Sequence, residues 1–313
     1  MTVYPVNENF AAEIGDIDLS KPLSSEDRTE IEAAFNRSSV LVFPDQHLST
    51  DQHLDFARNF GPLETSIHAV RNDARLRVRP EIADVSNLDA GDSIWGKESR
   101  KRMFEMSNRM WHTDSSFRRV PAKASLLYAR SIPPVGGQTE FADMRAAYDA
   151  LADDMKQRLR GLVAEHAIMY SRKKLGFTDF SDEENQTLPP VPQALVRRHA
   201  GSGRMGLYLA SHAGRIFGMK DEDGKALLQQ LIDHATQRQF VYSHRWRVYD
   251  LVMWDNRCTM HRGTEYDERR WKRDMHRGKA YDDLHWPRDL QRATVSDIAP
   301  TCEQEGIAAP AAA

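Results

Sequence analysis

The sequence Trp111-His112-Thr113-Asp114 places an imidazole and a carboxylate two positions apart. On an extended strand, residues two apart point the same way, so the side chains of His112 and Asp114 can meet at one point. His261, at the end of the apolar segment 251–260, offers a second imidazole. Two histidine nitrogens and one carboxylate fill one face of an octahedron and leave three positions open. The pattern therefore predicts an iron site made by His112, Asp114 and His261.

Three classes of protein are compatible with this donor set. The two-histidine, one-carboxylate face with open positions is typical of non-haem Fe(II) oxygenases, the interpretation that we favour. A zinc hydrolase uses similar donors with one open position. A non-enzymatic, metal-binding jelly roll is the third alternative. A His-x-Asp tripeptide arises often by chance in a chain with 12 histidines and 46 acidic residues, so further residues must decide.

The length and composition favour one globular domain that acts on small molecules. A chain of 313 residues with 40% hydrophobic residues can build a substantial core, and we expect a single domain over 1–313. The formal net charge of -3 gives no basic surface for nucleic acid. The chain has two cysteines, no signal-peptide pattern and no apolar stretch of about 20 residues. We therefore expect a reduced, cytoplasmic protein that does not enter a membrane.

The hydrophobic pattern predicts many short strands with helices outside them. Ser49 followed by Gln52 is a capping-box signature ahead of a helix at 51–60. The other expected helices cover 25–35, 144–151 and 221–236, and the expected strands cover 38–43, 125–129, 139–142, 195–198 and 206–210. This order favours a mainly β fold with flanking helices, in the form of a double-stranded β-helix or jelly roll.

Three segments are expected to lie outside the core. Residues 88–108 are mostly polar and predict a long loop that leads into the metal-binding strand. Residues 173–194 are interpreted as a surface insertion. The segment 298–313 ends in Ala-Ala-Pro-Ala-Ala-Ala and is expected to be a frayed tail.

A tandem duplication follows the apolar segment. Residues 261–275 and 276–290 are identical at eight of fifteen positions, and each copy begins with His-Arg-Gly. One extra copy is too short for a repeat architecture, so we interpret it as an enlarged loop. His276 is thus an alternative to His261 as the metal ligand. We prefer His261 because it follows the apolar segment without interruption.

Several further motifs make the chain similar to one known family. The quoted residues are Ile14-Gly15-Asp16-Ile17-Asp18-Leu19, Phe60-Gly61-Pro62-Leu63-Glu64, the Trp-His-x-Asp run at Trp111, Pro134-Val135-Gly136-Gly137-Gln138-Thr139, Ala142-Asp143-Met144 with Tyr148, and Trp254-Asp255-Asn256-Arg257 before His261. With them the chain resembles the Fe(II)- and 2-oxoglutarate-dependent oxygenases of the taurine dioxygenase and 2,4-dichlorophenoxyacetate dioxygenase family. The resemblance covers nearly the whole chain.

The resemblance implies how the cosubstrate binds. In this family 2-oxoglutarate chelates Fe(II) through its keto and C1 carboxylate oxygens, O2 is the oxidant, and the distal carboxylate meets a threonine and an arginine. Thr139 matches the threonine. Arg273 and Arg288 each lie twelve residues after the histidine of their own copy, so the duplication leaves two candidates. We favour Arg288, because the residues that follow it match the family's final strand better.

The resemblance also implies where the substrate binds. The arginine four residues after the cosubstrate arginine is Arg292, or Arg277 in the other register, and it matches one that binds the acidic group of the substrate. His68 matches a histidine that contacts this anion. The segments at 148–151 and 170–176 resemble the herbicide-degrading branch. We therefore expect ether-cleaving oxidation of a phenoxyalkanoate such as 2,4-dichlorophenoxyacetate, with taurine or an alkylsulfonate as the alternative. A homo-oligomer is expected by analogy with the family.

Overall fold

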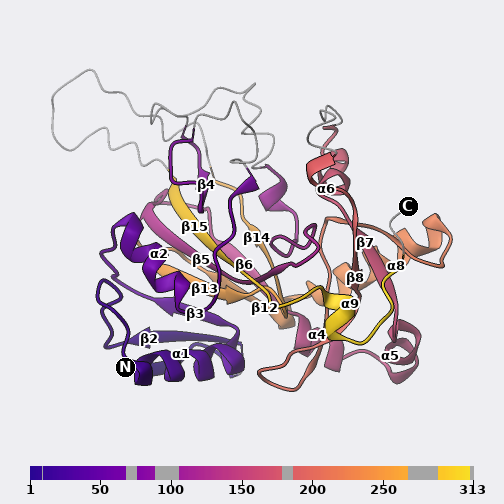
Figure 1. The fold of residues 1–313 in the computed structure, drawn as a ribbon, viewed down its shortest axis with the longest axis horizontal. Helices are drawn as coiled ribbons and strands as arrows, with labels where there is room; N and C mark the ends of the chain where they lie inside the picture. The colour runs from indigo at the N-terminus through magenta and orange to yellow at the C-terminus, as the bar shows by residue number, and fades with distance from the viewer. Residues whose placement is uncertain (9, 68–75, 89–105, 178–185, 267–287, 311–313) are drawn as a thin grey trace.

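The computed structural model describes residues 1–8, 10–67, 76–88, 106–177, 186–266 and 288–310, which form four β-sheets with helices around them (Figure 1). The helices are α1 (Ser25–Ser38), α2 (Thr50–Arg58), α4 (Met144–Asp149), α5 (Asp153–Leu159), α6 (Ile168–Lys174), α8 (Asp221–Ala235) and α9 (Thr301–Gln304), with 3-10 turns η2 (Ser107–Arg109) and η3 (Arg238–Phe240). The strands are β1 (Thr2–Pro5), β2 (Ala11–Gly15), β3 (Val40–Phe43), β4 (Ile82–Ser86), β5 (Ala122–Ser131), β6 (Thr139–Asp143), β7 (Val163–His166), β8 (Val191–Ala194), β9 (Val196–Arg198), β10 (Met205–Leu207), β11 (Ala213–Ile216), β12 (Val241–His244), β13 (Leu251–Asp255), β14 (Thr259–Gly263) and β15 (Asp289–Ser296).

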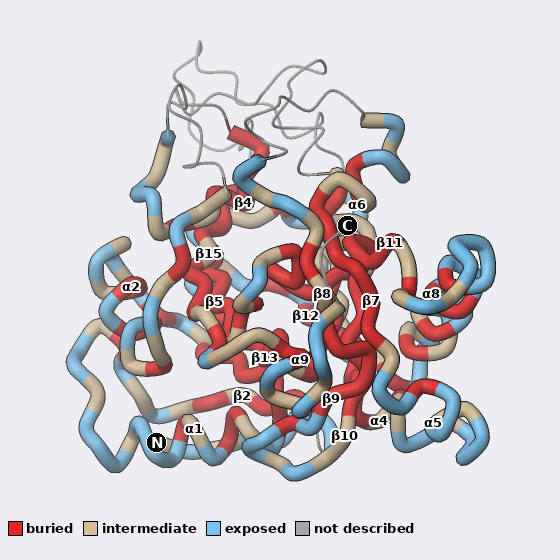
Figure 2. Tube along the Cα trace, turned by 45° about the vertical axis from the view of Figure 1, so that its right-hand side comes forward, coloured by how far each residue is buried: buried red, intermediate tan, exposed pale blue. Residues whose placement is uncertain are grey.

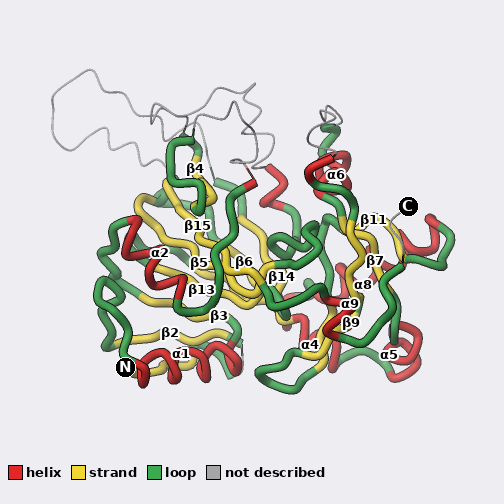
Figure 3. The backbone as a smooth tube through the Cα atoms, in the orientation of Figure 1, coloured by secondary structure: helices red, strands yellow, loops and turns green. Residues whose placement is uncertain are grey.

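The largest sheet has seven strands in the order β1-β2-β3-β13-β5-β15-β4. Its two faces follow from the alternation of side chains along each strand. On β3, Leu41 and Phe43 pack into the cluster that includes residues of α1 and α2, while Val40 and Val42 belong to the cluster on the opposite face. Both faces are therefore covered, and the central strands carry almost continuous apolar sequence. Figure 3 shows the two helices beside this sheet.

A three-stranded sheet, β12-β6-β14, faces the large sheet and carries two of the predicted site residues. Phe141 of β6 lies in one buried cluster with Val252 and Trp254 of β13, which joins the two sheets. Thr139 and His261 come from β6 and β14 of the smaller sheet. The remaining sheets, β11-β7-β8 and β10-β9, contribute to a separate core that also includes residues of α8. Figure 2 shows buried residues concentrated along the strands and exposed residues on the helices and loops around them.

Most of the expected elements are present, with small shifts at their ends. The capping box at Ser49 and Gln52 is formed, and α2 begins at Thr50. The helix expected at 25–35 runs on to Ser38, so β3 begins at Val40 rather than at 38. The chain has a mixed α/β fold with several sheets, and the described strands follow no single jelly-roll order in their pairing.

Three expectations need correction. His112 and Asp114 do not lie on a strand: His112 makes a single bridge to His261, and Asp114 lies in a turn. The surface insertion ends before β8, whose residues pair with β7 and are mostly buried. The C-terminal segment is not frayed along its length, because Thr301 of α9 donates a hydrogen bond to Gln193 and is fully buried. Most of the loop expected at 88–108 lies outside the described residues.

Among the described residues, no helix is long and apolar enough to span a membrane.

Candidate metal centre and its two recesses

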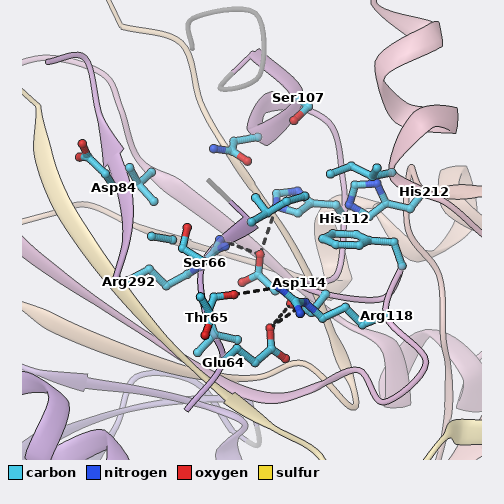
Figure 4. A pocket seen from close by; sticks show the side chains of 18 of the residues that line it. Glu64, Thr65, Ser66, Asp84, Ser107, His112, Asp114, Arg118, His212 and Arg292 are labelled. Carbon is cyan, nitrogen blue, oxygen red and sulfur yellow. Dashed lines mark hydrogen bonds and ion pairs between the residues drawn. The ribbon is translucent and has the colours of Figure 1, made fainter. Parts of the chain in front are cut away.

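Backbone pairing brings the three predicted ligands together. His112 and His261 exchange backbone hydrogen bonds of 3.0 and 2.8 Å, which places the two imidazoles side by side with ring centroids 4.2 Å apart. Asp114 follows two residues later, and its backbone N–H donates to Asn256 Oδ1 at 3.2 Å. A single β-bridge and a turn therefore bring the three side chains together, where the sequence pattern predicted a strand. Figure 4 shows Asp114 between His112 and Arg292.

The donor atoms of the triad fit a single cation. His112 Nε2 lies 3.7 Å from Asp114 Oδ1, and His261 Nε2 lies 3.6 Å from Asp114 Oδ2. One donor atom from each residue lies within 4.8 Å of the other two, and all three side chains are buried. Metal–nitrogen and metal–oxygen bonds are about 2.0–2.2 Å long, so donors at these separations can share one ion. The triad could therefore hold a transition-metal ion.

The protonation states also suit a metal. His112 Nδ1 lies 2.8 Å from the carbonyl oxygen of Met110, and because a carbonyl only accepts, Nδ1 carries the hydrogen and Nε2 keeps its lone pair. Burial lowers the pKa of His112 and holds the pKa of His261 well below its usual value. Burial alone would raise the pKa of Asp114, but Arg292, the two imidazoles and Ser125 lower it. The site thus offers two neutral imidazoles and one carboxylate.

Two recesses open beside the triad, and His112 and Arg292 line both. We call the first the Thr139 recess; it is lined by Val85, Ser86, Asn108, Arg109, His112, Leu127, Thr139, Trp254, His261, Gly263, Thr264, Tyr266, Arg288 and Arg292. We call the second the Phe117 recess; it contains Phe117, Ile168, Arg172, His212 and Thr294 together with the segment 64–67 and the ligands His112 and Asp114. A small molecule in either recess would therefore lie next to the metal donors.

The Thr139 recess is built for an anion. Arg288 is 9% exposed, and its Nη1 donates to the carbonyl oxygen of Val85 at 3.1 Å. None of the described carboxylates forms an ion pair with this guanidinium, although a buried charge is costly without one. Thr139 Oγ1 accepts a 3.0 Å hydrogen bond from Trp246 Nε1, which leaves the hydroxyl hydrogen of Thr139 free to donate into the recess. The pair offers donors for a carboxylate.

A glycine turn lets the chain come close to this recess. Gly136 has a φ of 79°, and a Cβ added there would lie 2.5 Å from the carbonyl oxygen of Glu265. Only glycine tolerates both the left-handed backbone and this close approach. The contact keeps the residues after β14 near Arg288, whose guanidinium lies 5.7 Å from the ring centre of Tyr266.

The Phe117 recess combines apolar and charged side chains. Phe117 meets His212 edge to face with ring centroids 5.1 Å apart, and Ile168 is 5% exposed. Arg172 is also buried, at 7% exposure. Arg292 of β15 in the large sheet places its Nη1 2.6 Å from Asp114 Oδ1, so this cation contacts the predicted metal ligands. Such a lining suits a small organic acid with an apolar body.

The structure brings together six of the residues selected from the sequence. These are His112, Asp114, His261, Thr139, Arg288 and Arg292. His68, Arg273, Arg277 and the alternative ligand His276 lie outside the described residues. Sequence reasoning missed Trp246 and Ser125, which contact the site from elsewhere in the chain. A tryptophan two residues after a strand carries no signal of this role.

A second cluster of metal-ligating side chains lies nearby in the core. His199, Asp255 and Cys258 are all buried and have donor atoms within 4.8 Å of one another. Asp255 is already saturated, because Arg257 donates to both of its oxygens and His199 Nε2 lies 3.0 Å from Oδ2. Burial raises the pKa of the Cys258 thiol to about 12. We interpret this cluster as part of the packing of the core.

Comparison with known proteins identifies the family of the chain. Residues 2–279 match the model of the taurine catabolism dioxygenase TauD, TfdA family. The chain therefore belongs to this family. It is 48% identical over 263 residues to the alpha-ketoglutarate-dependent 2,4-dichlorophenoxyacetate dioxygenase of Cupriavidus pinatubonensis, covering 84% of this chain and 92% of that protein. It is 39% identical over 274 residues to the (S)-phenoxypropionate/alpha-ketoglutarate-dioxygenase of Sphingobium herbicidovorans, covering 85% and 90%.

A solved structure extends the similarity to the whole described fold. The chain matches the crystal structure of AAD-2 in complex with Mn(II) and N-oxalylglycine with a TM-score of 0.84 and 45% sequence identity, covering 96% of this chain and 99% of that one. The C-terminal part of the chain, which lies beyond the family match, is thus largely included in the structural match. Because the chain belongs to a dioxygenase family, the zinc-hydrolase alternative is wrong.

Proposed function

We propose that this protein uses Fe(II), 2-oxoglutarate and O2 to oxidise a phenoxyalkanoate such as 2,4-dichlorophenoxyacetate, with cleavage of its ether bond. The observation that carries the proposal is that residues of the His112, Asp114 and His261 triad line two recesses of different chemistry. The names of the relatives at 48% and 39% identity support this class of substrate. N-oxalylglycine in the AAD-2 crystal is a dicarboxylate, as the Thr139 recess would require.

The Thr139 recess would bind the cosubstrate. Arg288 presents a planar guanidinium that can hold the distal carboxylate through two parallel hydrogen bonds. Thr139 adds a third donor, because Trp246 already occupies one lone pair of its hydroxyl oxygen. Bound iron would supply the activation of O2, coupled to the decarboxylation of 2-oxoglutarate to succinate and carbon dioxide.

The Phe117 recess would hold the substrate. Phe117 and Ile168 offer an apolar surface for an aromatic ring, and Arg292 offers a cation for the carboxylate. Hydroxylation of the carbon between the ether oxygen and the carboxylate gives a hemiacetal. The bond between that carbon and the ether oxygen then breaks, the hydroxyl proton passes to the ether oxygen, which stays on the aryl group, and a phenol and a 2-oxo acid are released. The role of these residues is to orient that carbon toward the metal donors.

Substrate-dependent turnover tests the proposal. Purified protein is incubated with Fe(II), 2-oxoglutarate and O2 in the presence of 2,4-dichlorophenoxyacetate, taurine or an alkylsulfonate, and succinate and phenol are measured. We expect 2,4-dichlorophenoxyacetate to stimulate succinate release and to give one 2,4-dichlorophenol per succinate. Stimulation by taurine alone would replace ether cleavage with the sulfonate alternative. No oxygen uptake after anaerobic loading with iron would reject the oxygenase itself.

Membership of the family also supports proposals about the core, the location and the oligomeric state of the protein. We infer a jelly-roll core from the family, in which β12-β6-β14 and the large sheet supply the two facing layers. A cytoplasmic location and a homo-oligomeric state remain predictions, which fractionation of the source cells and light scattering can test.

A further inference from the structure

The carboxylate of Asp114 is held by a closed ring of hydrogen bonds. Asn256 Oδ1 accepts from the backbone N–H of Asp114 at 3.2 Å and from Trp254 Nε1 at 3.1 Å. Asn256 Nδ2 then donates to Ser125 Oγ at 2.9 Å, and Ser125 Oγ donates to Asp114 Oδ2 at 2.7 Å. The ring therefore begins at the backbone of Asp114 and returns to its side chain.

Each hydrogen in this ring has one direction. Two donors face the same atom of the Asn256 amide, so that atom must be the oxygen and the other the NH2 group. Ser125 receives a hydrogen from this NH2 group, and Asp114 Oδ2 can only accept, so the Ser125 hydroxyl must donate to Oδ2. Asn256 and Ser125 are fully buried, which excludes competition from water.

We propose that Asn256 and Ser125 are positioning residues that hold Asp114 as a metal ligand through one oxygen only. This inference rests on the proposed function, in which His112, Asp114 and His261 bind the metal. The Ser125 hydrogen bond fixes the rotation of the carboxylate and engages Oδ2. Arg292 Nη1 lies 2.6 Å from Oδ1, so the metal would bind Oδ1 through its other lone pair. A carboxylate that chelated through both oxygens would occupy one more position of the octahedron. The one-oxygen mode keeps three positions, two for the keto acid and one for O2.

The test uses Mn(II), whose affinity and bound waters can both be measured. Free Mn(II) is counted by electron paramagnetic resonance, and the number of bound waters is obtained from water-proton relaxation. We expect Ser125→Ala to weaken Mn(II) binding roughly 10- to 100-fold, the usual effect of removing a group that orients a metal ligand. We also expect the number of bound waters to fall by one, from roughly three for a triad on an octahedral ion.

Ser116→Ala is the matched control. Ser116 is fully buried two residues after Asp114, and within the described residues its hydroxyl has no hydrogen-bond partner. The control should keep the wild-type affinity and water number. The inference fails if Ser125→Ala keeps both, if only its affinity falls while the water number stays, or if Ser116→Ala has the same effect. If His112→Ala keeps Mn(II) with wild-type affinity, the metal site itself is wrong, which is a different failure.

Discussion

Two buried clusters of this molecule each combine histidine and aspartate with a third possible metal ligand, and they have opposite chemistry. In the cluster of His199, Asp255 and Cys258, the backbone N–H of Ser202 donates to His199 Nδ1, so His199 Nε2 carries a hydrogen and donates to Asp255. In the triad, His112 Nδ1 donates to the carbonyl of Met110, and Nε2 keeps its lone pair. Nε2 can therefore bind a metal where Nδ1 donates a hydrogen bond, as in His112, and cannot where Nδ1 accepts one, as in His199.

The two carboxylates differ in the same way. Arg257, whose side chain is 13% exposed, donates to both oxygens of Asp255, so the pKa of this carboxyl lies far below its usual range despite the opposing effect of burial. Asp114 has one hydrogen bond from Ser125 and one ion pair with Arg292, which also borders both recesses. The closed cluster therefore contributes to stability, and the open one is left for ligands.

Removal of one imidazole from each cluster should give the largest contrast. We expect His261→Ala to lose bound iron and turnover, because it removes a metal ligand. His199→Ala should bind iron as the wild type does and unfold at a lower temperature, because Asp255 loses a partner. Iron analysis after anaerobic loading and thermal unfolding of both variants measure this. Equal iron loss in both would show that the clusters are not distinct.

Removal of the closed carboxylate should be costly for folding. Asp255→Ala leaves Arg257, whose side chain is 13% exposed, without its partner. Breaking a buried ion pair from one side costs about 3–5 kcal/mol, and we expect a loss at the lower end because Arg257 keeps some contact with water. Chemical denaturation measures the free energy of unfolding, and Mn(II) titration of the folded variant serves as the control. A variant as stable as the wild type would contradict the structural role of this cluster.

The two copies of the duplicated segment can be separated by their arginines. We expect Arg288→Ala to raise the KM for 2-oxoglutarate roughly 10- to 100-fold, since hydrogen bonds to charged groups contribute about 1.5–3 kcal/mol. Arg273→Ala should leave this KM unchanged. Steady-state succinate release at varied 2-oxoglutarate decides between them, and the reverse result would assign the cosubstrate to the first copy.

The smallest effect should come from Trp246, which acts through Thr139. Trp246→Phe removes one neutral hydrogen bond, worth about 0.5–1.5 kcal/mol, so the affinity for 2-oxoglutarate should fall roughly 2- to 12-fold. The loss should largely disappear in a Thr139→Val background, where the hydroxyl is gone. Calorimetric titration of the Mn(II)-loaded variants with 2-oxoglutarate gives the four affinities. Additive losses would show that the two residues act independently.

Residue chemistry made part of this site predictable. His112, Asp114 and His261 could be selected because few side chains bind iron and the spacing of the motif is short. The geometry was wrong in detail, because a single bridge and a turn align the donors where a strand was expected. The duplication left Arg288 and Arg273 open, and the structure describes Arg288 alone.

The remaining features depend on contacts between residues far apart in sequence. Trp246 and Thr139 are 107 positions apart, and Asn256 and Ser125 are 131 apart, so no local pattern reports their hydrogen bonds. The C-terminal segment was expected to fray because of its composition near the end. Instead, Gln304 of α9 accepts a 2.9 Å hydrogen bond from the buried Arg197, which holds this segment against β9.

The most direct test of the account is an anaerobic titration of the Fe(II)-loaded protein with 2-oxoglutarate, followed by visible absorption. A keto acid that chelates ferrous iron through two oxygens gives a metal-to-ligand charge-transfer band. We expect this band in the wild type and in His199→Ala, and its loss in His261→Ala. A wild type without the band, or a His261→Ala variant that retains it, would contradict the assignment of the metal to His112, Asp114 and His261.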